Sequence, residues 1–163
     1  MTTFTNPTII SILEHYKTIR ALGYMDGLAC RDEETYMPDA AAPLRGEAHG
    51  YLSVLIKKLM LDQTFVAMVH EARDADLTVH ERAVVNALSR EIQQYISLPD
   101  RRLQQRSEAK TNATSARKKA RETDTFSFFA PHLEHLITLI REKAELIGYA
   151  AHPYDALIDD YER

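Results

Sequence analysis

Histidine and cysteine are side chains that can bind a metal or take part in attack on a substrate, and this chain has seven histidines and one cysteine. A helical zinc peptidase needs His-Glu-x-x-His, because two histidines four residues apart face one metal while the glutamate deprotonates its water. The strings that begin at His70 and His80 carry Asp74 and Val84 where the second histidine is needed. A di-metal site needs Glu-x-x-His, and no histidine here has a glutamate three residues earlier. We therefore predict no catalytic and no metal-ligating residue.

The remaining reactive side chains give weaker signals. His132 and His135 stand three residues apart and could form one edge of a metal site, but no second pair accompanies them, so we expect a surface or packing role. Cys30 could be a nucleophile only with a histidine base nearby in space, and Arg31 is the one sequence neighbour that favours its thiolate. We interpret Cys30 as a small apolar packing residue. No glycine-rich phosphate loop is present.

A basic segment lies between residues 101 and 121, with Glu108 as its only acid. Its basic residues are Arg101, Arg102, Arg106, Lys110, Arg117, Lys118, Lys119 and Arg121. Such a stripe could contact phosphates, yet no aromatic residue is interleaved to stack on bases. The rest of the chain is acidic and supplies ion-pair partners within a bundle or across an oligomer. We do not expect a nucleic-acid partner.

Helical periodicity sets the predicted elements. Asn6-Pro7 should start a helix that runs to about Cys30, followed by a structured corner that closes at Pro38. Further helices are predicted from Pro43 to Met60, after a cap at Asp62, after a capping box at 78–81, over 101–121, within 126–147 and, as a short turn or helix, within 152–162. On the helix from Pro43 the predicted buried side is Leu44, Ala48, Tyr51, Leu52, Leu55, Leu59 and Met60.

Length and composition agree with this interpretation. The chain has 163 residues, a mass of 18.6 kDa, 5 Gly and 6 Pro, so we predict an all-α fold, a single domain over residues 1–163 built as one bundle of about six helices. A net charge of -4 favours neither nucleic acid nor anionic lipid. The polar start at Thr2–Pro7, the lone cysteine and the lack of a long apolar run predict a cytoplasmic protein with no membrane segment.

Two stretches resemble the N-terminal helical region of the thermostable (Taq-type) metallocarboxypeptidase family. Asp32-Glu-Glu-Thr-Tyr-Met-Pro38 with Ala40-Ala-Ala and Arg45 is similar to that family's Trp-Asp-Gln-Glu-Thr-Tyr-Met-Pro corner and the helix after it. The second stretch is similar to three motifs of the family, which occur in the same order. Its counterparts to the Ala-Arg and Phe-x-x-Phe-x-Pro motifs are Ala120-Arg121 and Phe126 with Phe129-Ala-Pro131. Its counterpart to the Tyr-Asp-Ala-Leu-Leu-Asp-x-Tyr-Glu motif is the string from Tyr154 to Glu162.

The resemblance implies a helical scaffold of zinc- or cobalt-dependent carboxypeptidases, which are often dimeric. The family's His-Glu-x-x-His helix, its third ligand and its substrate-binding motifs have no counterpart here, so no cofactor is assigned to this chain. Arg31 and Arg117 stand where tryptophan is expected, and Glu33 replaces a glutamine. Because burying an unpaired arginine is costly, we expect Arg31 and Arg117 to be solvated or ion-paired.

These observations favour a non-catalytic, stand-alone relative of the family's N-terminal region that acts by self-association, as a homodimer, or through another protein partner. The alternative is the N-terminal half of a metal-dependent carboxypeptidase that a separate catalytic half completes. We expect the chain to be inactive alone. The family-like surface, with a structural or a binding role, comprises Asp32, Glu34, Tyr36, Met37, Arg45, Arg121, Tyr154 and Asp155.

Overall fold

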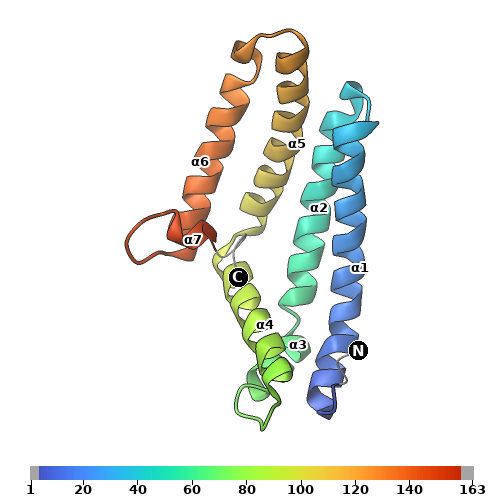
Figure 1. Ribbon diagram of the computed structural model, residues 1–163, viewed down its shortest axis with the longest axis vertical. Coiled ribbons are helices and arrows are strands. Elements are labelled where there is room, and N and C mark those ends of the chain that lie inside the picture. Colours follow the sequence, from blue (N-terminus) through green and yellow to red (C-terminus); the bar gives the residue numbers. More distant parts are fainter. Residues whose placement is uncertain (1–3, 159–163) are drawn as a thin grey trace. The chain divides into compact units, whose positions relative to one another are not determined.

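The computed structural model describes residues 4–158, which form helices and no strand (Figure 1). The α-helices are α1 (Pro7–Thr35), α2 (Ala42–Met60), α3 (Gln63–Glu71), α4 (Val79–Ser97), α5 (Asp100–Glu122), α6 (Ala130–Ile147) and α7 (Asp155–Ile158). Two 3-10 turns, η1 (Asp39–Ala41) and η2 (Phe126–Phe128), precede α2 and α6. The predicted all-α fold is confirmed. No helix within residues 4–158 combines the length and the hydropathy that a bilayer span requires.

The chain divides into two compact units. The first unit contains residues 4–25 and Leu55–Ile96, and the second contains Asp26–Val54 and residues 97–158. The single domain over the whole chain stays a prediction.

The first unit has an apolar core. Asn6 begins α1 as predicted, because its side-chain oxygen accepts hydrogen bonds from the backbone N–H groups of Thr8 and Ile9, at 2.9 and 3.4 Å. Asp62 caps α3 in the same way. The buried core residues are Ile9, Ile12, Ile19, Met60, Phe65, Val69, Ala72, Val85, Leu88 and Ile92. On α4, Val85 is buried in this core, whereas Val84 is half-buried and Ile96 is exposed.

The predicted capping box at the start of α4 is present and does more than cap. The backbone N–H of Thr78 donates to Glu81 Oε2 at 3.0 Å, and the N–H of Glu81 donates to Thr78 Oγ1 at 3.3 Å. The other carboxylate oxygen of Glu81 accepts the N–H groups of Thr5 and Asn6, at 3.1 and 3.0 Å. These backbone donors, Asn6 first, lower the pKa of Glu81 to about 2. Glu81 therefore ties the start of α1 to the start of α4.

The corner before Pro38 differs from the prediction. Helix α1 continues to Thr35, five residues beyond Cys30, so only Tyr36 and Met37 form the turn. Pro38 restricts the residue before it and leaves the preceding turn free to stay helical. Two carbonyls near the end of α1 accept hydrogen bonds from cationic side chains of other helices, since Arg45 donates to the Ala29 carbonyl and Lys118 donates to the Glu33 carbonyl.

The predicted buried face of α2 is wrong over its first half. Leu44, Ala48, Tyr51 and Leu55 are exposed, while Leu52 and Leu59 are half-buried and Met60 is buried. The buried face instead carries Ala42, Gly46, His49, Gly50 and Val54. The reason is a close approach of α5, because a Cβ atom built on Gly46 would lie 3.2 Å from the Glu108 Cα atom. Glycine allows the two backbones to approach, and this outweighs the larger apolar side chains on the opposite face.

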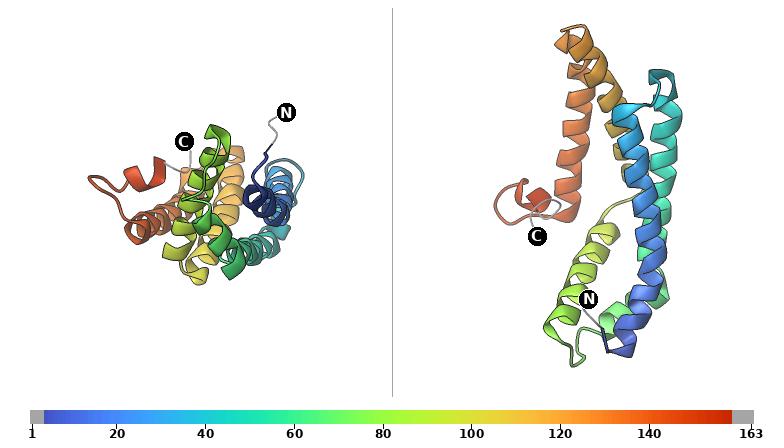
Figure 2. Two further views of the ribbon diagram at one scale, coloured as in Figure 1. Left: turned by 90° about the horizontal axis from the view of Figure 1, so that it is seen from below. Right: turned by 45° about the vertical axis from the view of Figure 1, so that its right-hand side comes forward.

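Helices α5 and α6 form an antiparallel pair joined through η2 (Figures 1 and 2). The inward face of α5 carries the buried Leu103, Ala109, Thr111, Ala113 and Ala120, and Ala116 is half-buried. On α6, Leu139 is buried and Ile137 is exposed. Gly148 follows the end of α6, with a φ of 85° that favours glycine. The predicted short helix near the end is α7, whereas Asp159–Glu162 lie outside the described residues.

Candidate functional site

A cluster of polar side chains occupies the interior of the second unit, where the end of α1, the start of α2 and the middle of α5 meet. We define the polar cluster as Asp26, Cys30, Asp32, Glu33, Arg45, His49 and Thr111. Asp26, Cys30 and Glu33 lie four and three residues apart, so they share one face of α1. Gly46 lets α5 approach α2 and brings Thr111 to the same place. The cluster therefore depends on three helices.

His49 is the centre of the polar cluster. Its side chain is 7% exposed, and its Nδ1 atom lies 2.5 Å from Asp26 Oδ1. Its Nε2 atom lies 3.0 Å from Glu33 Oε1, within ion-pair distance, but the geometry there is not that of a hydrogen bond. Each ring nitrogen of one buried imidazole thus faces a carboxylate.

Glu33 is 3% exposed, and a carboxylate so deeply buried needs partners. The hydroxyl of Thr111 donates to Glu33 Oε1 at 2.8 Å, and His49 faces the same oxygen. Arg45, nearer the surface, holds the end of α1 by donating to the Asp32 carboxylate at 2.7 Å and to the Ala29 carbonyl at 2.8 Å. The polar cluster is held mainly by its own members.

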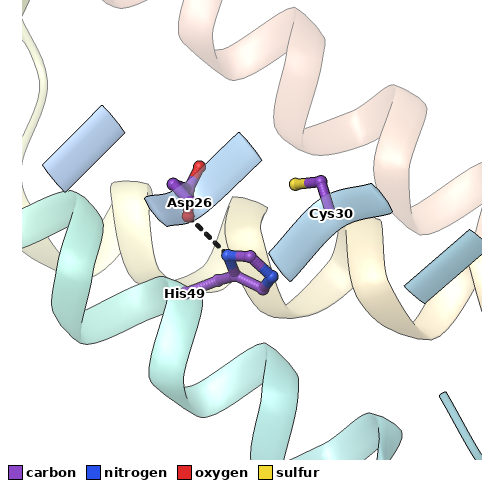
Figure 3. A group of neighbouring side chains, drawn as sticks. All are labelled: Asp26, Cys30 and His49. Atoms are coloured by element: carbon purple, nitrogen blue, oxygen red, sulfur yellow. Dashed lines mark hydrogen bonds and ion pairs between the residues drawn. The ribbon is translucent and has the colours of Figure 1, made fainter. Parts of the chain in front are cut away.

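Cys30 adds a thiol to the cluster. Figure 3 shows its sulfur beside the pair that Asp26 and His49 form. One ligand atom from each of these three residues lies within 4.8 Å of the others. Burial raises the pKa of the thiol, the Lys110 ammonium 3.8 Å away opposes this, and Asp26 and Glu33 raise the pKa further. A thiol, an imidazole and a carboxylate that converge are donors that could hold a metal.

Two of the eight predicted site residues are brought together, because Arg45 pairs with Asp32. Glu34, Tyr36 and Arg121 are exposed, and Met37 is half-buried beside the corner. Near the end of the described chain Tyr154 is exposed, and the Asp155 carboxylate accepts the N–H of His152 at 2.9 Å, which fixes the turn before α7. The role of the eight residues as a family-like surface stays a prediction.

Other expectations concern charged residues. Arg31 and Arg117 are both exposed, which agrees with the expectation that neither is buried without a partner. Several basic residues of α5 have partners in the second unit: Arg102 pairs with Glu142 at 3.0 Å, and Lys118 caps a carbonyl of α1. His132 and His135 are exposed.

Four residues of the polar cluster were not predicted from the sequence: Asp26, Glu33, His49 and Thr111. One signal was available, because Asp26, Cys30 and Glu33 share a helical face that carries no large apolar side chain. His49 and Thr111 gave none, since a lone histidine and a lone threonine join this face only through the packing of α2 and α5.

Comparison with known proteins identifies a family and relatives that match almost all of this chain. The model of the family described as carboxypeptidase Taq (M32) metallopeptidase matches residues 11–163. Thermostable carboxypeptidase 1 of Pyrococcus furiosus is 38% identical over 160 residues, which cover 98% of this chain and 32% of the relative. Carboxypeptidase 1 of Bacillus subtilis is 26% identical over 157 residues, which cover 94% of this chain and 30% of the relative.

The solved structure of the Pyrococcus furiosus carboxypeptidase matches with a TM-score of 0.78 and 37% identity, over 99% of this chain and 33% of that one. The chain thus spans about a third of the length of the relatives it matches. A family match over residues 11–163 and a fold match of this extent agree with each other. The chain belongs to the carboxypeptidase Taq (M32) metallopeptidase family.

Proposed function

We propose that this chain is a non-catalytic helical scaffold that acts through protein contacts, and that self-association is its principal contact. The observation that supports this is a row of exposed apolar side chains on α2, which we call the α2 stripe: Leu44, Ala48 and Tyr51. Leu44 is 72% exposed and Tyr51 is 64% exposed. Spacings of four and three residues place all three on one face of the helix.

The α2 stripe cannot be hidden by rotating the helix. The opposite face of α2 packs through Gly46 and Gly50 against α5, and a larger side chain at Gly46 would meet the α5 backbone. Contiguous exposed apolar surface is typical of interaction sites. A symmetric dimer is the commonest way to cover such a surface with a second copy of the same chain. The proposal therefore places the homodimer contact on α2.

No cofactor is part of this proposed role. The family's zinc or cobalt chemistry needs His-Glu-x-x-His, and the sequence contains no such string. The residues of this chain therefore do not fit the family's metal centre, and no catalytic step is derived from them.

The alternative is that the chain is the N-terminal part of a metal-dependent carboxypeptidase, completed by a catalytic part on a separate or longer chain. The coverage of about a third of each carboxypeptidase relative favours this alternative. The α2 stripe would then be covered by the catalytic part instead of a second copy. A cytoplasmic location remains an expectation under both proposals.

Sedimentation velocity over a range of concentrations tests the scaffold proposal. We expect a concentration-dependent dimer that the double variant Leu44→Glu with Tyr51→Glu converts to monomer. Val79→Glu is the matched control, because Val79 is an exposed apolar residue at the start of another helix, where a carboxylate is tolerated. A dimer that persists in the double variant would contradict the proposed contact.

The alternative is tested by mixing the chain with the complementary part of the Pyrococcus furiosus relative and measuring release of C-terminal residues from peptides with added zinc or cobalt. A one-to-one complex that hydrolyses peptides would replace the scaffold proposal. A monomer that forms no complex would overturn both.

A further inference from the structure

The donor atoms of Asp26, Cys30 and His49 have the composition of a transition-metal site that the family's own metal motif does not include. We propose that these three side chains bind Zn²⁺, with His49 Nδ1, Cys30 Sγ and one Asp26 oxygen as ligands and Glu33 as an outer carboxylate. This inference is independent of the proposed scaffold function, because it concerns the interior of the second unit and not the α2 stripe.

The first support is convergence. Asp26 and Cys30 are four residues apart on α1, and His49 faces them from α2 (Figure 3). Their ligand atoms lie within 4.8 Å of one another. A tetrahedral zinc with bonds of about 2.0–2.3 Å separates its ligand atoms by about 3.3–3.8 Å. Asp26 Oδ1 and His49 Nδ1, now 2.5 Å apart, must move apart by about 1 Å, and the Asp26 side chain, at 35% exposed, lies closer to solvent than that of His49.

The second support is the hydrogen bonding of His49, which is independent of the spacing. A neutral imidazole carries one N–H, and here each ring nitrogen faces a carboxylate. When Nδ1 donates to Asp26, Nε2 presents a lone pair to Glu33 and has no hydrogen-bond partner. With zinc on Nδ1, the single N–H sits on Nε2, and the ring would have to turn for this N–H to donate to Glu33 Oε1, 3.0 Å away. Metal-bound histidines commonly donate their second ring N–H to a carboxylate.

Glu33 is itself fixed for this role. Thr111 donates to Glu33 Oε1 at 2.8 Å, so the carboxylate cannot turn away from His49 without breaking that buried hydrogen bond. The side chain of His49 is therefore oriented by an outer shell built from α1 and α5. A metal ion at Nδ1 would leave the single N–H of His49 on the side of Glu33.

Charge and ligand type select the ion. A thiolate and a carboxylate neutralise the two charges of Zn²⁺, and the exposed ammonium of Lys110, 3.8 Å from the sulfur, can move into solvent when the metal enters. Magnesium and calcium require oxygen ligands, whereas thiolate with imidazole is typical of zinc. Asp26 and Cys30 are partly exposed, which gives the ion an entry path and leaves a fourth position for water.

The test uses the whole chain, kept reduced, with zinc affinity measured by competition against a chromophoric chelator. We expect one zinc per chain, a loss of about 100-fold or more in affinity for Cys30→Ser, and a loss of about 10- to 100-fold for Glu33→Gln, the cost usual for an outer-shell partner. The matched control is His132→Gln with His135→Gln, which removes two exposed histidines and leaves the affinity unchanged.

Cobalt substitution checks the same site in the unaltered chain, so it does not depend on whether a variant folds. We expect the intense visible bands of tetrahedral Co²⁺ together with a sulfur-to-cobalt charge-transfer band that disappears in Cys30→Ser. Circular dichroism is the check that this variant keeps its helix content. Absence of the charge-transfer band, or zinc affinity that survives Cys30→Ser and falls in the His132 and His135 control, would overturn the proposal.

Discussion

The interiors of the two units are filled with different kinds of side chain. The first unit buries large apolar groups, and six of them, Phe65, Ile9, Ile12, Met60, Val69 and Val85, are almost completely shielded from solvent. In the second unit, over residues 26–54 and 97–158, the largest side chain shielded to this degree is Thr111, and the small Ala144 is shielded as fully. Alanine and glycine make up much of the rest of that interior, together with the apolar Val54, Leu98, Leu103 and Leu139 and the polar Glu33, His49 and Lys143.

This difference shows two ways to pack helices. Large apolar side chains contribute stability in proportion to the area they remove from water. Small residues bury little area, but they let backbones approach, and polar side chains between them specify one arrangement through directed bonds. The first unit therefore follows the apolar pattern of its sequence, while the second follows a set of specific contacts.

The largest effect is expected in the apolar core. Phe65→Ala leaves a cavity in the first unit and should lower the free energy of unfolding by about 3–5 kcal/mol. The matched control is Phe126→Ala on η2, whose ring is exposed and whose loss should cost well under 1 kcal/mol. Urea denaturation followed by circular dichroism measures both. Similar losses for the two variants would break the contrast between a buried core and an exposed ring.

A smaller loss is expected where α2 meets α5. Gly46→Val places a branched side chain against the Glu108 backbone and should cost about 1–3 kcal/mol through overpacking. Gly23→Ala on α1 is the control, because nothing lies within 4 Å of its added Cβ and the better helix propensity should stabilise by about 0.5–1 kcal/mol. Thermal unfolding separates the two signs, and a neutral Gly46→Val would show that close approach is not required.

Removing one hydroxyl probes the polar interior directly. Thr111→Val keeps the shape of the side chain but removes the donor to buried Glu33, which should cost about 1–3 kcal/mol. Thr114→Val on the same helix is the control, since its hydroxyl bonds only the Lys110 carbonyl of its own helix. Equilibrium denaturation of both variants decides the point. A Thr111→Val variant as stable as the control would mean that the polar cluster contributes no specific stability.

A pH-dependent effect is expected where Glu81 joins the start of α1 to the start of α4. Its folded pKa of about 2 lies below the ordinary value of 4.5, so its contribution to stability is complete above pH 4.5 and is lost as the pH falls toward 2. Thermal unfolding between pH 2 and 7 should show a decline below pH 4.5 that is less steep in Glu81→Gln. An identical decline in both proteins would assign the acid sensitivity to other carboxylates.

The predictions from sequence succeeded where local physics decides. The caps at Asn6, Asp62 and the box at Thr78 depend on bonds within a few residues, and all three are present. The predicted buried face of α2 was wrong. The spacing of apolar side chains does not indicate that Gly46 faces a neighbouring helix.

The polar cluster was likewise predictable only in part from the sequence. Asp26, Cys30 and Glu33 share a helical face that can be read from their spacing, but nothing along the chain indicates that His49 and Thr111 complete it. The ion pair between Arg45 and Asp32 was partly predicted, since the sequence motifs indicated both residues but not that they pair.

The sequence by itself determined the helical class, the helix starts and the family resemblance, because periodicity, capping residues and ordered motifs are properties of neighbouring residues. Only the tertiary structure decided which face of α2 is buried, how far α1 extends and which side chains converge on His49. Those outcomes depend on contacts between residues far apart in the chain, where the close approach of two backbones outweighs the hydrophobicity of individual side chains.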